Sequence, residues 1–449
     1  MQRFTPGFCL LIVGLLSARA VGADAVTANW PAWRGPLATG VAPQGNPPVT
    51  WSETSNVKWK VAIPGRGKGT PIVWDDLVFV QTATPTGQKA TPAAEAPGAS
   101  RPTGGRGGGM STERPTESYR FVLLCLNRRT GQTVWQKVLS EQVPHEGHHP
   151  TEGSFASASP VTDGQRVFAY FGSRGLYCLD FQGNLKWSKD LGRMQIKMAF
   201  GEGSSPALSG GKLVVNWDQE GPCFIAAFDT NSGHELWRQP REEGTSWATP
   251  LIVSHDGRTE VITSATRKIR SYDLDTGKLL WECDGMTQNV IPTPVAGDGL
   301  VFPISGFRGS SLLAIRLGRT GDLTGSDAIV WQHHKSTPYV PSPLLYGNRL
   351  YFLANNNGLL SCFDAKSGKA LIDAERLEAL PGVYASPVGA HDRVYLVGRN
   401  GTTLVIKAAD KLEILATNRL DDQFDASPAI AGRELFLRGM QNLYCLAGD

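Results

Sequence analysis

The segment His145–His149 is the part of the sequence most suggestive of metal chemistry, because its letters H-E-G-H-H match the pattern H-E-x-x-H. In that pattern two histidines one helical turn apart bind zinc, and the glutamate acts as a general base. The chemistry needs a helix, but Pro144, Gly147 and Pro150 interrupt the segment, so we expect an exposed polar loop. The side chains that remain candidates for a metal site of another kind are His145, His148, His149 and Glu152.

The stretch Gly65–Gly69 (GRGKG) resembles a phosphate-binding loop in composition only. It leads into a predicted strand and not into a helix, so no helix dipole would hold a phosphate there, and we interpret its glycines as turn residues. No Gly-x-Ser-x-Gly elbow stands out either, and such a serine would still need a base and an orienting acid. The catalytic residues, if there are any, therefore stay unknown.

Polar and aromatic side chains at two recurring places of the chain are candidates for binding a ligand. The first set precedes a repeated Ser/Thr-Pro dipeptide and comprises Glu202, Trp247, Asn289, Tyr339, Tyr384 and Asp425. The second set lies in loops between predicted strands and comprises Arg174, Trp217, Asp218, Gln219, Glu220, Arg267, Lys268, Arg308, Asn355–Asn357, Arg399, Asn400 and Arg438. If each repeat folds alike, both sets open on the same face of the molecule.

Arginines in the loops of several repeats could ring one mouth of a channel, where their planar guanidinium groups would favour an anionic or carboxylate-bearing ligand. The alternative is that they satisfy a polar rim by pairing with neighbouring acids, the candidates being Glu202, Asp218, Glu220 and Asp425. Trp217 and Trp247 could stack on a planar ring or a sugar, or could simply pack. The residues predicted to bind a ligand are Glu202, Trp217, Asp218, Trp247, Asn289, Arg308, Tyr339, Arg399, Asp425 and Arg438.

An internal repeat must position these side chains. A Ser/Thr-Pro dipeptide followed by a turn and a β-rich run recurs at Thr70-Pro71, Ser159-Pro160, Ser205-Pro206, Thr249-Pro250, Thr293-Pro294, Ser342-Pro343, Ser386-Pro387 and Ser427-Pro428. Proline cannot donate to a strand ladder, so it suits the first residue of a strand. The spacing is that of a four-stranded propeller blade.

A second element, Gly-x-x-x-Trp, closes most of the repeats. It appears as Gly131…Trp135, Gly183…Trp187, Gly233…Trp237 and Gly277…Trp281. Trp331 fills the place without the glycine, and Ile372 and Leu415 stand in for Trp in the next two repeats. We expect each Trp to fill the gap between neighbouring sheets, because a large flat ring covers much apolar area.

The last repeat lacks a fourth strand, and Val57–Val61 supplies one from the other end of the chain. We therefore predict an all-β fold: one eight-bladed β-propeller of four-stranded blades over residues 24–449, its last blade closed by the N-terminal strand. A Gly-, Pro- and Ala-rich insertion over 84–118 interrupts the first blade. It holds too little apolar surface to order itself, and we expect a disordered loop.

Residues 1–23 read as a secretory signal, with Arg3, an apolar run over Cys9–Leu16 and a small-residue cleavage site near Ala23. We expect an exported protein, periplasmic or extracellular, with no transmembrane segment. Four of the remaining cysteines occupy one repeated place in the pattern, so we interpret them as small buried residues and not as disulfides: Cys125, Cys178, Cys362 and Cys445.

The 44 Lys and Arg residues nearly balance the 41 Asp and Glu residues, so the charge of +3 gives no reason to expect nucleic acid as a partner. The hydrophobic share of 41% is ample for a core and excludes a disordered chain. We expect a monomer.

The motif Asp-x-x-(Thr/Ser)-Gly-x-x-x-Trp, seen over Asp229–Trp237 and Asp273–Trp281, resembles the repeat of the pyrroloquinoline-quinone (PQQ) propellers. The opening over Trp30–Gly35 is similar to the exported PQQ-binding-like branch. That resemblance includes quinoprotein dehydrogenases and the non-enzymatic propeller of the outer-membrane barrel-assembly machinery. Fold does not choose between them. The chain lacks the adjacent cysteines that the dehydrogenases typically carry.

Two functions follow as expectations. The first is an exported, non-enzymatic binding or scaffold propeller that presents an Arg- and Trp-bearing face to a protein, a glycan or a small anionic ligand. The alternative, which the resemblance implies, is a dehydrogenase that uses PQQ and calcium to oxidise an alcohol or a sugar. The absence of an assignable catalytic set favours the first, and the cofactor stays unknown.

Overall fold

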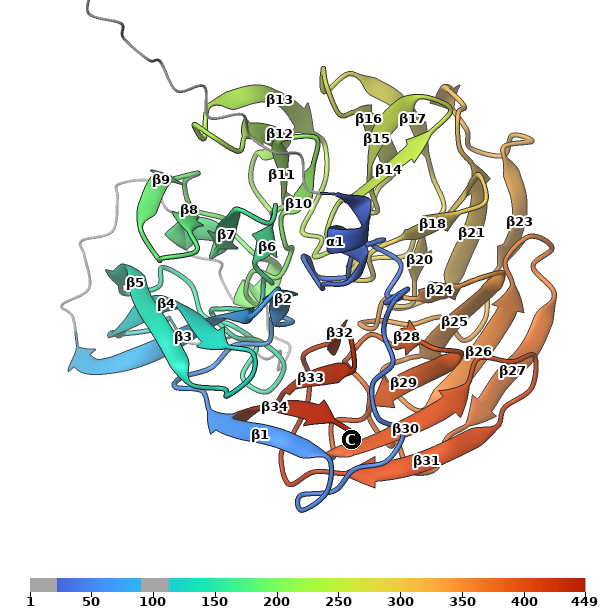
Figure 1. The fold of residues 1–449 in the computed structure, drawn as a ribbon. Helices are drawn as coiled ribbons and strands as arrows, with labels where there is room; N and C mark the ends of the chain where they lie inside the picture. The colour runs from blue at the N-terminus through green and yellow to red at the C-terminus, as the bar shows by residue number, and fades with distance from the viewer. Residues whose placement is uncertain (1–21, 90–111, 113, 449) are drawn as a thin grey trace, which may run out of the picture.

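The computed structural model describes residues 22–89, 112 and 114–448, and it places eight antiparallel sheets around a central axis (Figure 1). In most sheets the strands follow one another in sequence from the axis outward, while blade 8 takes its outer strand from the N-terminal part of the chain. The innermost strands of neighbouring blades contact each other around the ring. The predicted eight-bladed propeller is confirmed, while most of the predicted signal peptide lies outside the described residues.

The first four blades are consecutive in the sequence. Blade 1 contains β2 (Ile72–Trp74), β3 (Leu77–Lys89), β4 (Glu117–Asn127) and β5 (Thr133–Gln142). Blade 2 contains β6 (Val161–Thr162), β7 (Arg166–Tyr170), β8 (Leu176–Asp180) and β9 (Leu185–Lys189). Blade 3 contains β10 (Ala207–Ser209), β11 (Lys212–Trp217), β12 (Cys223–Asp229) and β13 (Glu235–Arg241). Blade 4 contains β14 (Leu251–His255), β15 (Arg258–Thr263), β16 (Ile269–Asp273) and β17 (Leu279–Cys283), with β22 (Gly321–Asp322) parallel to β17.

The other four blades complete the ring. Blade 5 contains β18 (Val295–Gly297), β19 (Leu300–Phe302), β20 (Ile304–Ser305), β21 (Ser311–Arg316) and β23 (Ile329–His333). Blade 6 contains β24 (Leu344–Tyr346), β25 (Arg349–Ala354), β26 (Leu359–Asp364) and β27 (Ala370–Arg376). Blade 7 contains β28 (Val388–Ala390), β29 (Arg393–Val397), β30 (Thr402–Lys407) and β31 (Ile414–Arg419). Blade 8 contains β32 (Ala429–Ala431), β33 (Glu434–Arg438) and β34 (Asn442–Ala447), and β1 (Val57–Ala62) pairs with β34 as its outer strand.

The described helical elements are short: α1 (Ala23–Thr27), η1 (Gly172–Arg174) and η2 (Lys197–Ala199). No helix among the described residues is long and apolar enough to cross a membrane. The strands of blade 1 extend into the segment expected as a loop, because Thr84 pairs with Arg120 and Lys89 with Glu117. The centre of that segment lies outside the described residues.

The Ser/Thr residues of the repeated dipeptides form a hydrogen-bonded ring around the axis. The backbone N–H of Thr70 donates to the hydroxyl oxygen of Ser159 in the next blade at 2.8 Å, and the pattern continues from blade to blade. The ring closes differently between the last blade and the first, where the Thr70 hydroxyl donates to the Ser427 carbonyl at 3.0 Å. The dipeptide therefore joins the blades at the axis, while its proline starts the inner strand.

The tryptophans join the blades farther out. In five blades the indole Nε1 donates to a backbone carbonyl in a turn of the following blade, the pairs being Trp59–Arg128, Trp135–Phe181, Trp187–Thr230, Trp237–Leu274 and Trp331–Ala365. Trp281 differs: its Nε1 donates to the Glu260 carboxylate of its own blade at 2.9 Å. The expected contacts between neighbouring sheets are confirmed.

In several blades the Trp position pairs with a small residue on the neighbouring strand. Cys125 faces Trp135, Cys178 faces Trp187, Cys445 faces Trp59 and Cys362 faces Ile372. The six described cysteines are buried and free, and burial is what the repeated place predicted for these four. The prediction that Leu415 replaces Trp is wrong by one residue: a register shift places Ala416 opposite Val405, and Leu415 is exposed.

The segment of residues 29–50, which we call the strap, crosses one face of the disc before it enters β1. Trp30 forms an antiparallel bridge with Val73 of blade 1, and Val41 forms a parallel bridge with Gly389 beside blade 7. Between them the buried Arg34 guanidinium donates to the carbonyls of Pro343 and Pro387, both at 2.9 Å. In Figure 1, α1 at the start of this segment lies in front of the axis.

Candidate functional site

A cavity of about 510 Å³, which we call the channel cavity, lies on the propeller axis. Four residues of the Ser/Thr ring form part of its wall, and Trp33 of the strap also lines it. Five residues of the first predicted set also line it, namely Glu202, Trp247, Tyr339, Tyr384 and Asp425. Residues that precede the inner strands therefore converge on the axis, as the repeat predicted.

The connection between blades 1 and 2 lies over this cavity. It is the segment that carries the H-E-G-H-H letters, and its residues His149–Gly153 line the cavity. The Thr151 carbonyl accepts hydrogen bonds from Lys68 Nζ at 2.9 Å and from Arg399 Nη2 at 3.3 Å. The segment is a loop, as predicted, but it is not simply exposed, because Lys68 before blade 1 and Arg399 of blade 7 bind it over the channel.

The histidines of this loop make structural contacts. His145 Nε2 lies 2.6 Å from the Met194 carbonyl oxygen, and His148 Nδ1 lies 2.9 Å from the His149 carbonyl oxygen. The His149 ring accepts from the backbone N–H of Glu152 at 3.2 Å. Within the described ranges no three His, Cys, Asp or Glu side chains lie close enough to share a metal ion. The loop thus offers no assembled metal site.

The charged side chains of the channel cavity are paired with one another. Arg174 Nη1 donates to Glu202 Oε1 at 2.6 Å, and the backbone N–H of Ser173 donates to the other carboxylate oxygen. The Glu202 carboxylate is therefore bonded through both oxygens. This contact brings together one residue from each predicted set.

A second ionic group lies across the cavity. Asp425 accepts from Lys68 Nζ at 2.6 Å and from Arg399 Nε at 2.6 Å. Burial lowers the pKa of Lys68, and the attraction of Asp425 partly offsets that effect. The pairing of predicted arginines with neighbouring acids, given above as the alternative to a ring of free cations, is what the structure shows for Arg174 and Arg399.

The aromatic rings of the channel cavity are held in place by contacts behind them. Trp247 Nε1 donates to the Gly201 carbonyl at 2.7 Å, and Tyr339 stacks on Phe307 with ring centroids 4.8 Å apart. The Arg399 guanidinium lies 4.1 Å from the centroid of Tyr384. Rings fixed in this way lose little conformational entropy when a ligand contacts them.

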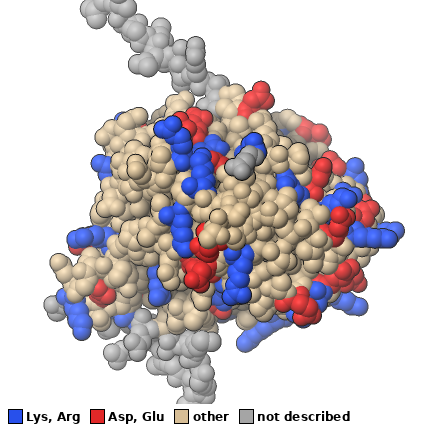
Figure 2. Space-filling view, turned by 60° about the horizontal axis from the view of Figure 1, so that its bottom comes forward, with Lys and Arg blue, Asp and Glu red and all other residues tan. Residues whose placement is uncertain are grey.

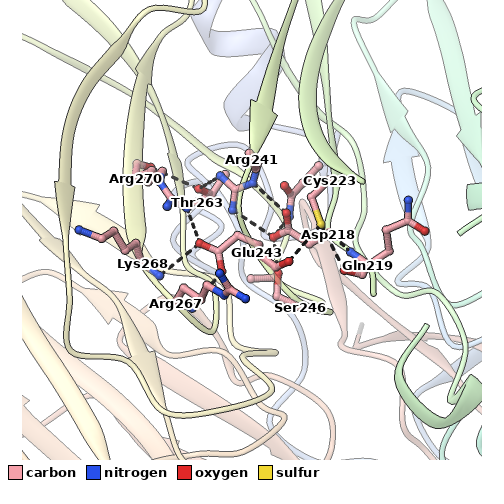
Figure 3. Close-up of polar contacts among 12 residues, drawn as sticks. Asp218, Gln219, Cys223, Arg241, Glu243, Ser246, Thr263, Arg267, Lys268 and Arg270 are labelled. Carbon is pink, nitrogen blue, oxygen red and sulfur yellow. Dashed lines mark hydrogen bonds and ion pairs between the residues drawn. The ribbon is translucent and has the colours of Figure 1, made fainter. Parts of the chain in front are cut away.

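Two predicted ligand-binding residues, Trp217 and Asp218, are buried between blades. Trp217 is 2% exposed and stacks on Phe224 with centroids 5.4 Å apart. Asp218 accepts from Arg241 Nε at 2.8 Å and Nη2 at 3.0 Å (Figure 3). Neither residue lines the channel cavity, and both make the packing contacts that were the alternative for them.

The Asp218–Arg241 pair belongs to a buried network that joins blades 3 and 4 (Figure 3). Arg241 Nη1 also donates to the hydroxyls of Thr263 and Tyr272, and nearby charges raise the pKa of its guanidinium despite the opposing effect of burial. Glu243 accepts from the backbone N–H groups of Arg267 and Lys268 and pairs with Arg270. The network is satisfied on all sides and has a structural role.

Three other predicted residues lie away from the channel cavity. The Asn289 side chain is buried and accepts from Lys197 Nζ at 3.0 Å. Arg308 is exposed, with its guanidinium 5.4 Å from the Phe307 ring. Arg438 is buried and donates to the Gln81 carbonyl, and burial lowers its pKa to about 9. None of the three lines the cavity.

The arrangement does not fit PQQ with calcium. A tricarboxylate cofactor needs free cations, but Lys68, Arg174 and Arg399 are already bound to carboxylates. Calcium needs a cluster of oxygen ligands that includes carboxylates, and Glu202 and Asp425 are occupied by their cationic partners. Figure 2 shows Lys and Arg side chains interspersed with Asp and Glu on the face in view.

Lys68, Glu152 and Trp33 are among the cavity residues that sequence reasoning missed. Lys68 precedes Thr70-Pro71 by the same distance at which Trp247 precedes Thr249-Pro250, so the repeat itself contained the signal. Its place in the GRGKG stretch led to a turn interpretation. Glu152 was considered only for metal binding. Trp33 had no signal, because the strap reaches the axis through contacts that are distant in the sequence.

A family profile described as outer membrane protein assembly factor BamB matches residues 120–282 and 223–447. No curated protein matches the sequence. Among solved structures, BamB from Moraxella catarrhalis is similar with a TM-score of 0.52 and 15% identity, over 73% of this chain and 89% of that one.

Two dehydrogenases have similar folds. The quinohemoprotein alcohol dehydrogenase from Comamonas testosteroni has a TM-score of 0.62 and 11% identity, over 95% of this chain and 82% of that one. A europium-containing methanol dehydrogenase has a TM-score of 0.61 and 10% identity, over 93% of this chain and 90% of that one. At these identities the likeness shows the fold alone.

Proposed function

The chain belongs to the family of the outer membrane protein assembly factor BamB, and from this premise we propose that it is an exported, non-enzymatic binding propeller. Its binding site is the channel cavity and the face around it. One observation carries the proposal: the cavity combines aromatic rings that are held from behind with charged groups that are already paired. Such a surface is preorganised for recognition.

Catalysis needs a group that is free to react, and the cavity offers few. A general acid or base must exchange its proton with a substrate within hydrogen-bond reach. Glu202 and Asp425 are instead fixed through both carboxylate oxygens, and Lys68 is fixed by two acceptors. Glu152 is held less tightly, with His149 Nε2 at 3.9 Å, Arg399 Nη1 at 4.0 Å and the Tyr384 hydroxyl as a further neighbour. Binding is therefore better supported than chemistry.

The partner that the family suggests is a protein, because the family description names an assembly factor. A glycan would fit the same combination of rings and polar groups. The paired arginines leave few free cations for the anionic ligand that the sequence suggested, so the proposal does not extend to it. The dehydrogenase alternative has the fold likeness in its favour, but no contact in the channel cavity supports it.

The test compares two double variants of the full chain, expressed with its own leader. Trp247→Ala with Tyr384→Ala removes two rings of the cavity, and Leu236→Ala with Leu279→Ala removes two exposed side chains on the outer strands of blades 3 and 4. Each protein is immobilised, incubated with envelope extract, cross-linked and analysed by mass spectrometry. Circular dichroism and the Tm establish that each variant is folded.

We expect the wild type and the outer-strand variant to retain the same partner, and the cavity variant to retain at least tenfold less, as for loss of a hot spot. Equal capture by all three proteins would remove the cavity as the binding site. Reduction of an electron acceptor by the wild type with PQQ, Ca²⁺ and an alcohol would replace the proposal with the dehydrogenase alternative.

A further inference from the structure

A second, small cavity of about 20 Å³, which we call the annex, lies behind Trp247. It is lined by Tyr170, Arg174 and Asn216, all of which are buried. Each of these side chains has one buried polar atom without a hydrogen-bond partner in the described structure: Tyr170 Oη, Arg174 Nε and Asn216 Oδ1. Unpaired buried polar groups are costly, so three around one cavity indicate an occupant.

The three atoms define what that occupant can be. Arg174 Nε–H is a donor only, and the Tyr170 hydroxyl can donate or accept. The orientation of Asn216 is fixed because its Nδ2 donates to Asp218 Oδ2 at 3.0 Å, which leaves Oδ1 as an acceptor. A group that accepts from Arg174 and donates to Asn216 must itself be both acceptor and donor. A water molecule or a hydroxyl meets this requirement, and a cavity of this volume holds about one.

The annex and the channel cavity are neighbours. Ser157, Glu202, Gly203 and Trp247 line both cavities. Gly203 lies against the Trp247 ring, where a Cβ would come within 3.1 Å of Cδ1. The hydroxyl site therefore lies directly beside one of the two indoles that line the channel cavity.

The charge of the channel cavity is balanced by its own groups. Arg174 pairs with Glu202, Asp425 with Lys68 and Arg399, and Glu152 lies 4.0 Å from Arg399, so three cations face three acids and a charged ligand would have to displace an existing partner. A neutral ligand would not. The ligand that suits fixed aromatic rings, paired ionic groups and a hydroxyl site has apolar faces, many hydroxyls and no charge.

We propose that the channel cavity binds a neutral carbohydrate, which stacks on Trp247 and reaches the annex either with one of its own hydroxyls or through one ordered water. This inference rests on the proposed binding function and names the class of ligand. The hydroxyl or water completes the hydrogen bonds of Tyr170, Arg174 and Asn216. The ionic pairs supply further donors and acceptors without a change of charge.

The test uses the full-length protein with chitotriose, maltotriose and cellotriose as neutral probes. A galacturonic acid trimer and a chitosan trimer serve as anionic and cationic probes. Binding is measured by calorimetry and by tryptophan fluorescence. We expect a neutral trimer to bind, Trp247→Ala to abolish its binding, and Tyr170→Phe to weaken it about tenfold, as for the loss of one buried hydrogen bond.

Tyr351→Phe is the matched control, because the Tyr351 hydroxyl donates to the Ala409 carbonyl in another part of the ring. We expect this variant to bind like the wild type. If Trp247→Ala does not fold, oxidative footprinting of the wild type gives the same information. The neutral trimer should protect Trp247 from oxidation and leave the exposed Met198 unprotected.

Preferential binding of a charged trimer would overturn the inference, and so would binding that Trp247→Ala leaves unchanged. If no neutral trimer binds while the cavity variant loses its protein partner, the carbohydrate is wrong and the proposed function stands. If neither a trimer nor a partner depends on the cavity, both fail. A crystal structure of the free protein should show one water in the annex, and a dry annex would contradict the argument.

Discussion

Gly277 lies against the indole of Trp237 in the preceding blade, so closely that a Cβ on Gly277 would come within 2.6 Å of Cδ2. The same contact recurs around the ring, the pairs being Gly131–Trp59, Gly183–Trp135, Gly233–Trp187 and Gly368–Trp331. The glycine of a Gly-x-x-x-Trp motif therefore packs against the tryptophan of the preceding blade and not against the tryptophan of its own motif. Each is half of a contact with a neighbouring blade.

Replacing Gly277 by Ala should destabilise the protein more than its backbone conformation alone explains. Gly277 has a φ of +71°, which costs an alanine about 1–2 kcal/mol, and the clash with Trp237 adds about 1–3 kcal/mol. Gly257 is the matched control, because its φ is +76° and no atom lies within 4 Å of a Cβ there. Urea unfolding should show a larger loss for Gly277→Ala than for Gly257→Ala, and equal losses would contradict the interblade contact.

Replacing Arg241 by Met should lower the free energy of unfolding by about 3–5 kcal/mol, because it leaves the buried Asp218 carboxylate without its cation. Both side chains of this pair are fully buried. Arg120→Met is the control, since Arg120 and Glu141 form a pair whose side chains are 50% and 40% exposed. We expect its loss to stay below about 1 kcal/mol. Denaturant titrations of both variants decide between a structural and a negligible role for the buried pair.

Stability should fall as the pH drops through about 6.5, the pKa of a histidine in an unfolded chain. Burial lowers the pKa of His148, and the charges of Arg66, Lys68 and Arg174 add to that effect. The unfolded chain then binds a proton that folded His148 does not, so folding is disfavoured below pH 6.5. The Tm of His148→Gln should depend less on pH between 7 and about 5, while the exposed His234→Gln should follow the wild type.

The cysteines should not react with alkylating reagents while the protein is folded. Burial raises the pKa of Cys125, Cys178 and Cys362 to about 12, so the reactive thiolate is scarce as well as inaccessible. Mass spectrometry after iodoacetamide treatment should find these three unmodified without denaturant and fully modified in guanidinium chloride. Rapid modification of the native protein would show that the blades open locally.

The fold was predictable because its signals are local and repeated. Ser/Thr-Pro marks each inner strand, and the small residue opposite Trp marks each sheet interior. The error at Leu415 shows the limit: the turn before β31 is one residue longer than the equivalent turn of blade 6, so the partly buried Ala416, and not Leu415, lies opposite Val405. The register of a strand is set by its pairing with the partner strand, and the spacing of residues within one segment does not reveal it.

The site was predictable only in outline. The rule that residues before Ser/Thr-Pro face the channel placed Glu202, Trp247 and Asp425 correctly. The burial of Asp218 was not predictable, because its partner Arg241 lies at the end of an outer strand, four residues beyond the Trp of the Gly-x-x-x-Trp motif, where the repeat specifies no residue. The position of Trp33 depends on the strap, which has no repeat. Side chains whose neighbours come from other blades cannot be assigned from their own segment.

The pairing of β1 with β34 sets the order in which the blades of the propeller can be completed during folding. Val57 is opposite Leu446, so blade 8 waits for the last strand to be synthesised. At the usual 5–20 residues per second, roughly 20–80 s separate the two strands. During this time β1 has an unpaired edge, and such edges invite association with other chains. The ring therefore closes only after β34 has been synthesised.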